Sequence, residues 1–154
     1  MSQYAISTVE LLRRPTLVTR FTCRPDELGR RFLADLPRIC DVVEAGNCAI
    51  AGPPFARYVG SEGDHLDVEV GVILVEPHAG EGDVIASALP GGPTAKTLHI
   101  GHYEALGAAH DALRIWAHVN GRPTRGTIYE LYVCDPSDGD DPSGWRTEVY
   151  LPLE

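Results

Sequence analysis

The segment TIYELYV, residues 127–133, has the composition of a buried β-strand but carries a glutamate at its centre. Its β-branched and aromatic residues favour a strand, in which successive side chains point to opposite faces. Glu130 therefore shares one face with Ile128 and Tyr132. An ionised carboxylate that leaves water costs several kcal/mol unless a partner compensates for the loss. The fold must therefore supply either water or a partner to Glu130.

The last strand-like segment, WRTEVYLPL at residues 145–153, repeats this pattern. Glu148 and Tyr150 share one face of it, as Glu130 and Tyr132 do in the first segment. We expect the aliphatic faces of both strands to pack against helices. The two Glu-x-Tyr faces are then expected to lie together on the other side, facing a groove.

The pattern of the whole chain predicts two copies of a strand–helix–strand–strand unit. In the first copy the helix spans residues 24–46 and the strands span 16–23, 48–59 and 65–76; in the second the helix spans 104–121 and the strands span 96–103, 127–133 and 145–153. Two further strands are expected at residues 4–12 and 84–89. The motifs DELG and EALG lie 78 residues apart, and the strands around Glu69 and Glu148 lie 79 apart, which indicates an internal duplication.

Apolar residues spaced three or four apart mark the buried stripe of each helix. For the first helix the predicted stripe is Leu28, Phe32, Leu36, Cys40 and Val43, and for the second it is Leu106, Ala109, Leu113 and Trp116. We predict an α+β fold in which two duplicated β-α-β-β (SHS2-like) units form antiparallel sheet, with two helices on one face. The whole chain, 1–154, is expected to be one domain with repeats at about 15–76 and 94–154.

Such copies are expected to associate about a pseudo-twofold axis and to leave a central ligand groove. In the first half, Gly71 and Gly52 are expected to give that groove room beside Glu69. Three partners for Glu130 remain open: a flat organic cation bound among the aromatic rings, a basic residue on an adjacent strand (Arg146 or Lys96), or water.

Composition excludes several classes of function. With 13 Lys+Arg against 22 Asp+Glu, a formal net charge of −9 and no basic cluster, binding to nucleic acid or to a membrane surface is not expected. The chain has no run of about 20 apolar residues, so a cytoplasmic location is predicted. The four cysteines are expected to be buried, reduced thiols, the six histidines form no obvious ligand set, and the acidic segment 135–144 is expected to be a solvated hairpin loop, so neither a metal nor a cofactor is predicted.

The segments GHYEALGAAHDALRIW, YELYVCDP and WRTEVYLPL, together with DVEVGV in the first half, resemble the GyrI-like effector-binding family over nearly the whole chain. The resemblance implies a groove that binds lipophilic and often cationic aromatic compounds. It makes Glu130 the counter-charge and Glu148 a second carboxylate. It implies further aromatic groove residues at Tyr132, Tyr150, Phe55 and Tyr103.

Family members occur alone or fused to helix-turn-helix regions in multidrug-responsive transcription regulators. This sequence begins at the first strand, so we expect no DNA-binding domain and expect a stand-alone protein that senses or sequesters small molecules. Two alternatives stay open. One is a hydrolase of cyclopropane-containing, DNA-alkylating natural products that uses the same acidic and aromatic residues, and the other is a protein-interaction module that acts on a topoisomerase.

Overall fold

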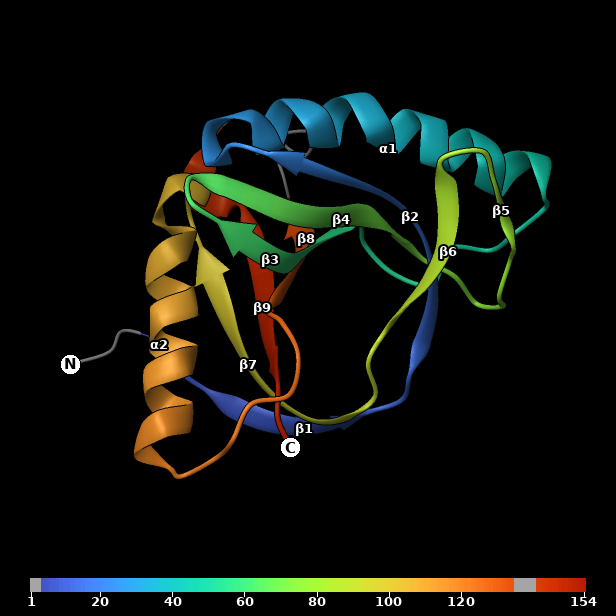
Figure 1. Cartoon of the computed structure of the whole chain (residues 1–154). Coiled ribbons are helices and arrows are strands. Elements are labelled where there is room, and N and C mark those ends of the chain that lie inside the picture. The colour runs from blue at the N-terminus through green and yellow to red at the C-terminus, as the bar shows by residue number, and fades with distance from the viewer. Residues whose placement is uncertain (1–3, 135–140) are drawn as a thin grey trace. The chain divides into compact units, whose positions relative to one another are not determined.

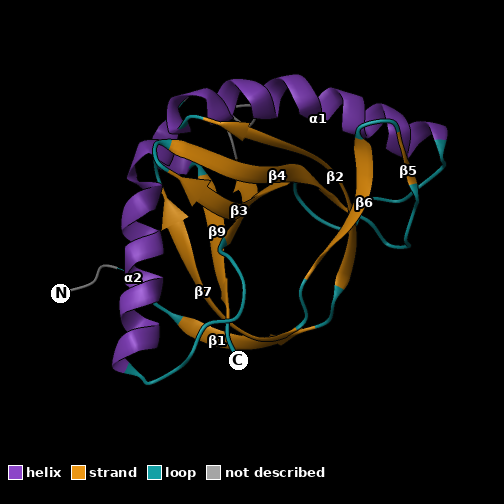
Figure 2. Ribbon diagram, viewed as in Figure 1, coloured by secondary structure: helices purple, strands orange, loops and turns teal. Residues whose placement is uncertain are grey.

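The computed structural model describes residues 4–134 and 141–154, and it confirms an α+β chain made of antiparallel strands and two long helices (Figures 1 and 2). The chain divides into two units, Leu12–Gly91 and the combination of Met1–Leu11 with Gly92–Glu154. We call these the N-terminal unit and the C-terminal unit. Residues 135–140 of the predicted acidic loop lie outside the described residues.

The N-terminal unit contains one long helix and five strands. In chain order its elements are β2 (Arg14–Cys23), η1 (Pro25–Glu27), α1 (Leu28–Ala45), β3 (Phe55–Glu62), β4 (His65–Ile73), β5 (Gly80–Glu81) and β6 (Val84–Leu89). The strands pair antiparallel in the order β3-β4-β2-β6-β5. The strand predicted from residue 48 begins only at Phe55, because Pro53 and Pro54 before it have no N–H to give to a ladder.

The C-terminal unit has the same core order of elements. It contains β1 (Ser7–Leu11), β7 (Gly92–Ile100), η2 (Tyr103–Ala105), α2 (Leu106–Val119), β8 (Tyr129–Cys134), η4 (Pro142–Gly144) and β9 (Arg146–Pro152), with strands paired in the order β1-β7-β9-β8. The units also correspond in register, since Thr19 lies opposite Val70 as Thr97 lies opposite Val149. The duplicated β-α-β-β pattern is therefore visible in the strand pairing itself.

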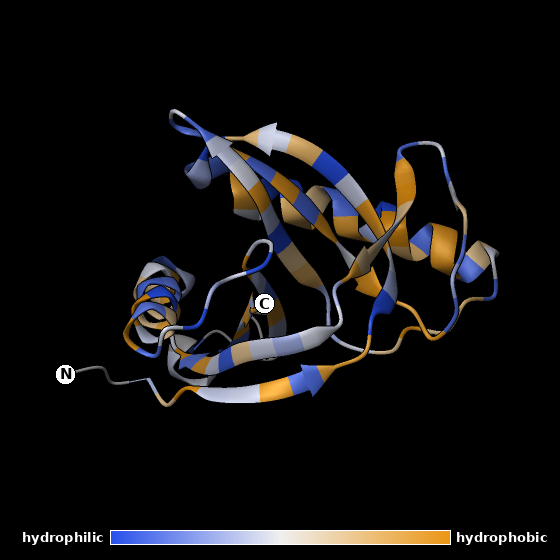
Figure 3. Cartoon of the chain, turned by 60° about the horizontal axis from the view of Figure 1, so that its bottom comes forward, coloured by the Kyte–Doolittle hydropathy of each residue, from blue (hydrophilic) through white to orange (hydrophobic). Residues whose placement is uncertain are grey.

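Alternating side chains give the strands of each unit one face that packs against the helix of that unit, and Figure 3 shows hydrophobic and hydrophilic bands alternating along the strands. In the C-terminal unit, Leu106, Ala109 and Leu113 are buried as predicted. The fourth buried residue of α2 is Ala117, and Trp116 is only partly buried. These residues pack on a cluster of strand and loop side chains: Ala95, Ile128, Val149, Leu151 and Leu153.

The predicted stripe of α1 is correct only in part. The fully buried residues of this helix are Asp35, Ile39 and Val43, while the predicted Phe32, Leu36 and Cys40 are half-buried beside them. The spacing of apolar residues did not predict the centre of the buried stripe, because one of the buried residues there, Asp35, is polar. Within residues 4–134 and 141–154, no helix is long and apolar enough to cross a membrane.

Candidate functional site

The register of β8 against β9 decides which of the predicted site residues lie together. Glu130 lies opposite Val149, whereas Glu148 lies opposite Leu131. Directly paired residues point to the same face of a sheet. Glu130 and Glu148 are therefore on opposite faces, and the prediction that the two Glu-x-Tyr pairs share one face is wrong.

Glu130 lies on the face that packs against α2. Its side chain is 1% exposed; the imidazole Nε2 of His110 lies 2.6 Å from Oε2, and the Tyr132 hydroxyl donates to Oε1 at 2.7 Å. An ionised carboxylate can only accept, so with Glu130 ionised it is His110 that donates. The sequence suggested Arg146 or Lys96 as a basic partner of Glu130. The structure instead places His110 of α2 beside this carboxylate.

A row of aromatic rings continues from Tyr132 towards the surface. The ring centroids of Tyr132 and Tyr103 are 5.5 Å apart, those of Tyr103 and Trp145 are 5.2 Å apart, and Trp145 lies 5.5 Å from the ring of His102. Tyr103, Tyr132 and Trp145 are all half-buried. The structure thus brings Glu130, Tyr132 and Tyr103 together as one cluster, to which His110 and Trp145 belong although the sequence did not single them out as site residues.

The second cluster lies on the face of the hairpin that points away from α2. Tyr129 and Tyr150 stack there with centroids 4.9 Å apart and planes 10° apart, and Tyr150 donates to Glu148 Oε1 at 3.1 Å. The ammonium of Lys96 lies 3.7 Å from Glu148 Oε2 and 5.5 Å from the centroid of the Tyr150 ring. Lys96, considered above as a partner of Glu130, is therefore the partner of Glu148.

Apolar side chains surround this second carboxylate. Leu98 and Leu131 lie opposite Glu148 on its two neighbouring strands. Leu98 and Ile100, two residues apart on β7, are 43% and 53% exposed, and the Glu148 side chain is 30% exposed. A partly exposed carboxylate between aromatic rings and open aliphatic surface can attract a lipophilic cation, because charge, ring quadrupole and apolar area all favour it.

Phe55, the remaining predicted site residue, belongs to the N-terminal unit. It is fully buried on β3 and lies on the same face as Glu69, whose side chain contacts Arg57 and Ser87. Gly71 does not give this face room, because a Cβ there would lie 2.0 Å from the backbone oxygen of Leu17 on β2. The position equivalent to Glu130 is Ala56, opposite Val70, and not Gly52, because the connection from helix to strand differs in length between the units.

Within the part of the chain that the structure describes, neither the thiols nor the groups of possible metal ligands indicate a reactive site. Cys23 is buried while Cys40 and Cys48 are half-buried, and all three are free. Burial raises the pKa of the Cys23 and Cys40 thiols, so these two groups stay protonated and weakly nucleophilic. Among the residues described, no three or more His, Cys, Asp or Glu side chains are grouped so that they could hold a metal ion.

Comparison with known proteins gives this arrangement a context. The family model of the GyrI-like small molecule binding domain matches residues 57–154. The solved C-terminal domain of EcmrR has a TM-score of 0.86 and 22% sequence identity, with 99% of this chain and 98% of that chain covered. The chain spans 57% of EcmrR as seen in its DNA complex, where the TM-score is 0.84.

Two more distant structures share the fold. SAV2435 bound to tetraphenylphosphonium has a TM-score of 0.63 at 8% identity, covering 99% of this chain and 94% of that one. A hydrolase from Listeria innocua has a TM-score of 0.60 at 14% identity, covering 100% and 94%. No curated protein matches this chain.

Proposed function

Since this chain belongs to the GyrI-like family of small-molecule-binding domains, we propose that it binds lipophilic, planar, often cationic aromatic compounds, which it senses or sequesters. Small-molecule sites combine much apolar surface with a few well-placed polar groups. The C-terminal unit offers that combination on the face of β7, β9 and β8 that points away from α2.

The position of Lys96 is the observation that carries this proposal. Its ammonium lies beside the Glu148 carboxylate and over the ring of Tyr150, at 3.7 Å and 5.5 Å. A cation from the chain itself thus occupies the place where the acid and the ring both attract positive charge. Because lysine is a flexible side chain with a compact charge, a larger aromatic cation can displace it and also cover Leu98 and Ile100.

Glu130 is less suited to meet a ligand in this conformation. Both of its oxygens accept hydrogen bonds within the unit, and 99% of its side chain is removed from solvent. We therefore assign the counter-charge to Glu148 and the apolar contact surface to the exposed Leu98 and Ile100, while the stacked rings of Tyr150 and Tyr129 are buried, at 6% and 0% exposed. The roles that the resemblance implies for Glu130, Tyr132, Tyr103 and Phe55 stay predictions, and the experiment below tests that of Glu130.

The ligand in one related structure supports the choice of chemistry. SAV2435 was solved with tetraphenylphosphonium, a cation whose charge is surrounded by aromatic rings. At 8% identity the likeness shows a shared fold, so the ligand class is carried to this chain as part of the proposal. Tetraphenylphosphonium is therefore the probe for the test.

Thermal stability in the presence of tetraphenylphosphonium and of neutral triphenylphosphine oxide tests the proposal. A ligand that binds only the native state at about a hundred times its Kd should raise the melting temperature by roughly 5–10 °C. We expect the cation to stabilise the wild-type protein, Glu148→Gln to weaken its binding about tenfold, and Lys96→Met to strengthen it. The affinity for the neutral compound should change little with either substitution.

Glu130→Gln is the matched control, because it removes a carboxylate from the other face of the same hairpin. Unchanged binding by this variant agrees with the assignment to Glu148. If Glu130→Gln loses the cation and Glu148→Gln keeps it, the counter-charge is Glu130 instead. If neither compound stabilises the wild-type protein at any concentration, the proposed function is wrong.

A second candidate is hydrolysis of cyclopropane-containing DNA-alkylating compounds, and the Glu130 cluster is the observation that favours it. The imidazole of His110, whose Nε2 lies 2.6 Å from the Glu130 carboxylate, can take a proton from attacking water at its other ring nitrogen, while the Tyr132 hydroxyl holds the same carboxylate at 2.7 Å. Turnover of such a substrate that is lost in Glu130→Gln would support it. An action on a topoisomerase stays a prediction.

A further inference from the structure

The N-terminal unit carries a carboxylate at the position that Glu148 occupies in the C-terminal unit. Glu69 lies opposite Arg20 on β2, and Glu148 lies opposite Leu98 on β7, at the same place in the two ladders. Both carboxylates thus lie on the face that points away from the helix of their own unit. Glu69, however, is 6% exposed and belongs to a filled site.

The group that fills this site is the guanidinium of Arg57. Its Nη1 lies 3.6 Å from Glu69 Oε1 and also donates to the backbone oxygen of Ala88 at 3.2 Å. The hydroxyl of Ser87 lies 3.2 Å from Oε1 and 3.4 Å from Oε2 and completes the surroundings of the carboxylate. The buried ring of Phe55 lies two residues before Arg57 on the same face of β3.

The two units therefore hold their equivalent carboxylates differently. Lys96 meets Glu148 with a point charge on a side chain that is 31% exposed. Arg57 meets Glu69 with a planar group that is 23% exposed and is also fixed by a backbone carbonyl. A guanidinium that also donates to a backbone carbonyl, on a less exposed side chain, is harder to displace than an ammonium held by the carboxylate and the ring.

We propose that Glu69 forms a second cation site of the amidinium or guanidinium class, which the chain fills with its own Arg57. The inference rests on the proposed function, in which the unmodified chain binds one external cation, at Glu148. The equivalent place beside Glu69 is already occupied by the Arg57 side chain. Arg57 then determines specificity by closing the site in the N-terminal unit. Removal of its side chain should leave a carboxylate, the hydroxyl of Ser87 and the ring of Phe55 around a space for a flat aromatic cation.

Benzamidinium is the probe, since its planar amidinium can bind a carboxylate as arginine does and its ring can contact Phe55. We expect Arg57→Ala to melt below the wild-type protein and to regain roughly 5–10 °C at about a hundred times the Kd of benzamidinium. Titration calorimetry of this variant should count one benzamidinium site more than in the wild-type protein. Arg57→Ala/Glu69→Gln, which leaves no unpaired charge in the site, should lose that additional benzamidinium site.

The variant Arg57→Ala/Glu148→Gln separates this inference from the proposed function. If it still binds benzamidinium while the wild-type protein binds no tetraphenylphosphonium, the Glu69 site is real and the proposal for Glu148 fails. If Arg57→Ala gains no saturable benzamidinium site, or gains one that survives Glu69→Gln, the inference is overturned. Should Arg57→Ala fail to fold, Arg57→Gln gives the same count of sites with a smaller change.

Discussion

At the scale of single residues, a buried carboxylate and its imidazole partner form a polar contact between α2 and β8 in the C-terminal unit. His110 lies on α2 four residues after Leu106 and three before Leu113, so it falls on the same stripe as the buried apolar residues. It thereby reaches Glu130 on β8 across the helix–sheet interface. A polar residue on an otherwise apolar helix stripe is a signal for a buried polar contact, and this signal was available in the sequence.

Replacing His110 tests how much that contact stabilises the chain. His110→Ala leaves one oxygen of a buried carboxylate without this partner, so we expect the free energy of unfolding to fall by about 1–3 kcal/mol. Urea unfolding at neutral pH measures the change. His110→Ala/Glu130→Gln should recover part of the loss, because a neutral amide costs less to bury than a carboxylate. A loss below about 0.5 kcal/mol for the single variant would mean that the contact contributes little.

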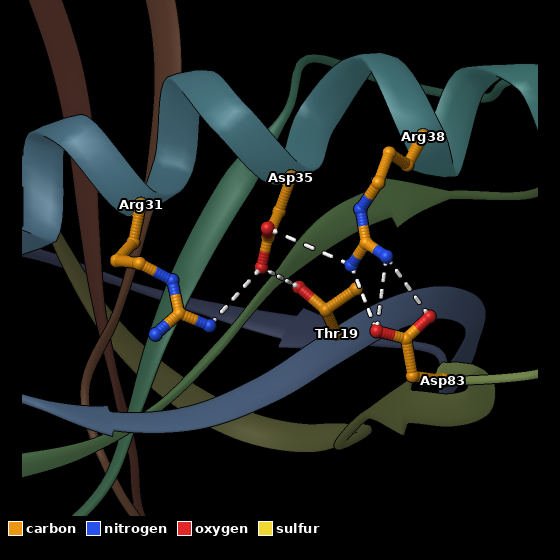
Figure 4. A network of polar contacts seen from close by, with 5 residues as sticks. All are labelled: Thr19, Arg31, Asp35, Arg38 and Asp83. Carbon is orange, nitrogen blue, oxygen red and sulfur yellow. Dashed lines mark hydrogen bonds and ion pairs between the residues drawn. The ribbon is translucent and has the colours of Figure 1, made fainter.

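At the scale of elements, a buried polar contact also holds α1 on the sheet of the N-terminal unit (Figure 4). Thr19 on β2 donates to Asp35 Oδ2 at 2.8 Å, and the guanidinium groups of Arg31 and Arg38 lie 3.7 and 3.6 Å from the same carboxylate. Arg38 also binds Asp83, next to β6, with its closest contact at 2.8 Å. Asp35 thereby ties the helix to β2, and Arg38 ties it to the turn between β5 and β6.

Two threonines on β2 allow a matched test of this attachment. Thr19→Val removes the donor to the buried Asp35, and we expect it to lower the free energy of unfolding by about 1–2 kcal/mol. Thr22→Val removes a similar hydrogen bond to Asp67 that is exposed, so its effect should stay within about 0.5 kcal/mol. Denaturant unfolding of both variants measures the difference. Equal losses would show that burial of the contact does not matter.

Elements were predictable from sequence to the extent that they depend on local pattern. Both helices lie inside their predicted ranges, each after a short 3-10 turn, because apolar spacing and helix-end residues act locally. The phase of β8 against β9 was not predictable, since alternation within each strand does not set the register between them. That register places Glu130 opposite Val149, and it is why the two carboxylates face different sides.

At the scale of the whole molecule, the repeat at an offset of 78–79 residues was enough to predict two similar units, because equivalent strands and helices need equivalent patterns. The partners inside each unit were not predictable. Whether Glu69 meets Arg57 or Glu148 meets Lys96 depends on which strands become neighbours and in what register. A single domain over 1–154 with a central groove stays a prediction.

Two surface carboxylates contribute a pH-dependent part of the stability, one in each unit. The hydrogen bond from Arg38 holds the pKa of Asp83 below its ordinary value against a smaller opposing effect of desolvation, and the backbone N–H of Ser143 lowers the pKa of Asp141 in the same way. A carboxyl group with a lowered pKa in the folded state stabilises the fold fully above the unfolded value of about 3.9. That stabilisation is lost as the pH falls through the lower folded value.

Replacing Asp83 should therefore lower the melting temperature at neutral pH and have little effect on it at strongly acidic pH. We expect Asp83→Asn to melt below the wild-type protein at pH 7, and the two melting temperatures to converge as the pH falls below about 4, where the wild-type carboxyl becomes protonated. Melting curves between about pH 2.5 and 7 measure the difference. Asp41→Asn, which changes an exposed aspartate on α1 of the same unit, is the control for loss of charge. A constant gap between Asp83→Asn and the wild-type protein over that range would contradict the assignment, because the Arg38 contact would then stabilise the chain without depending on the charge of Asp83.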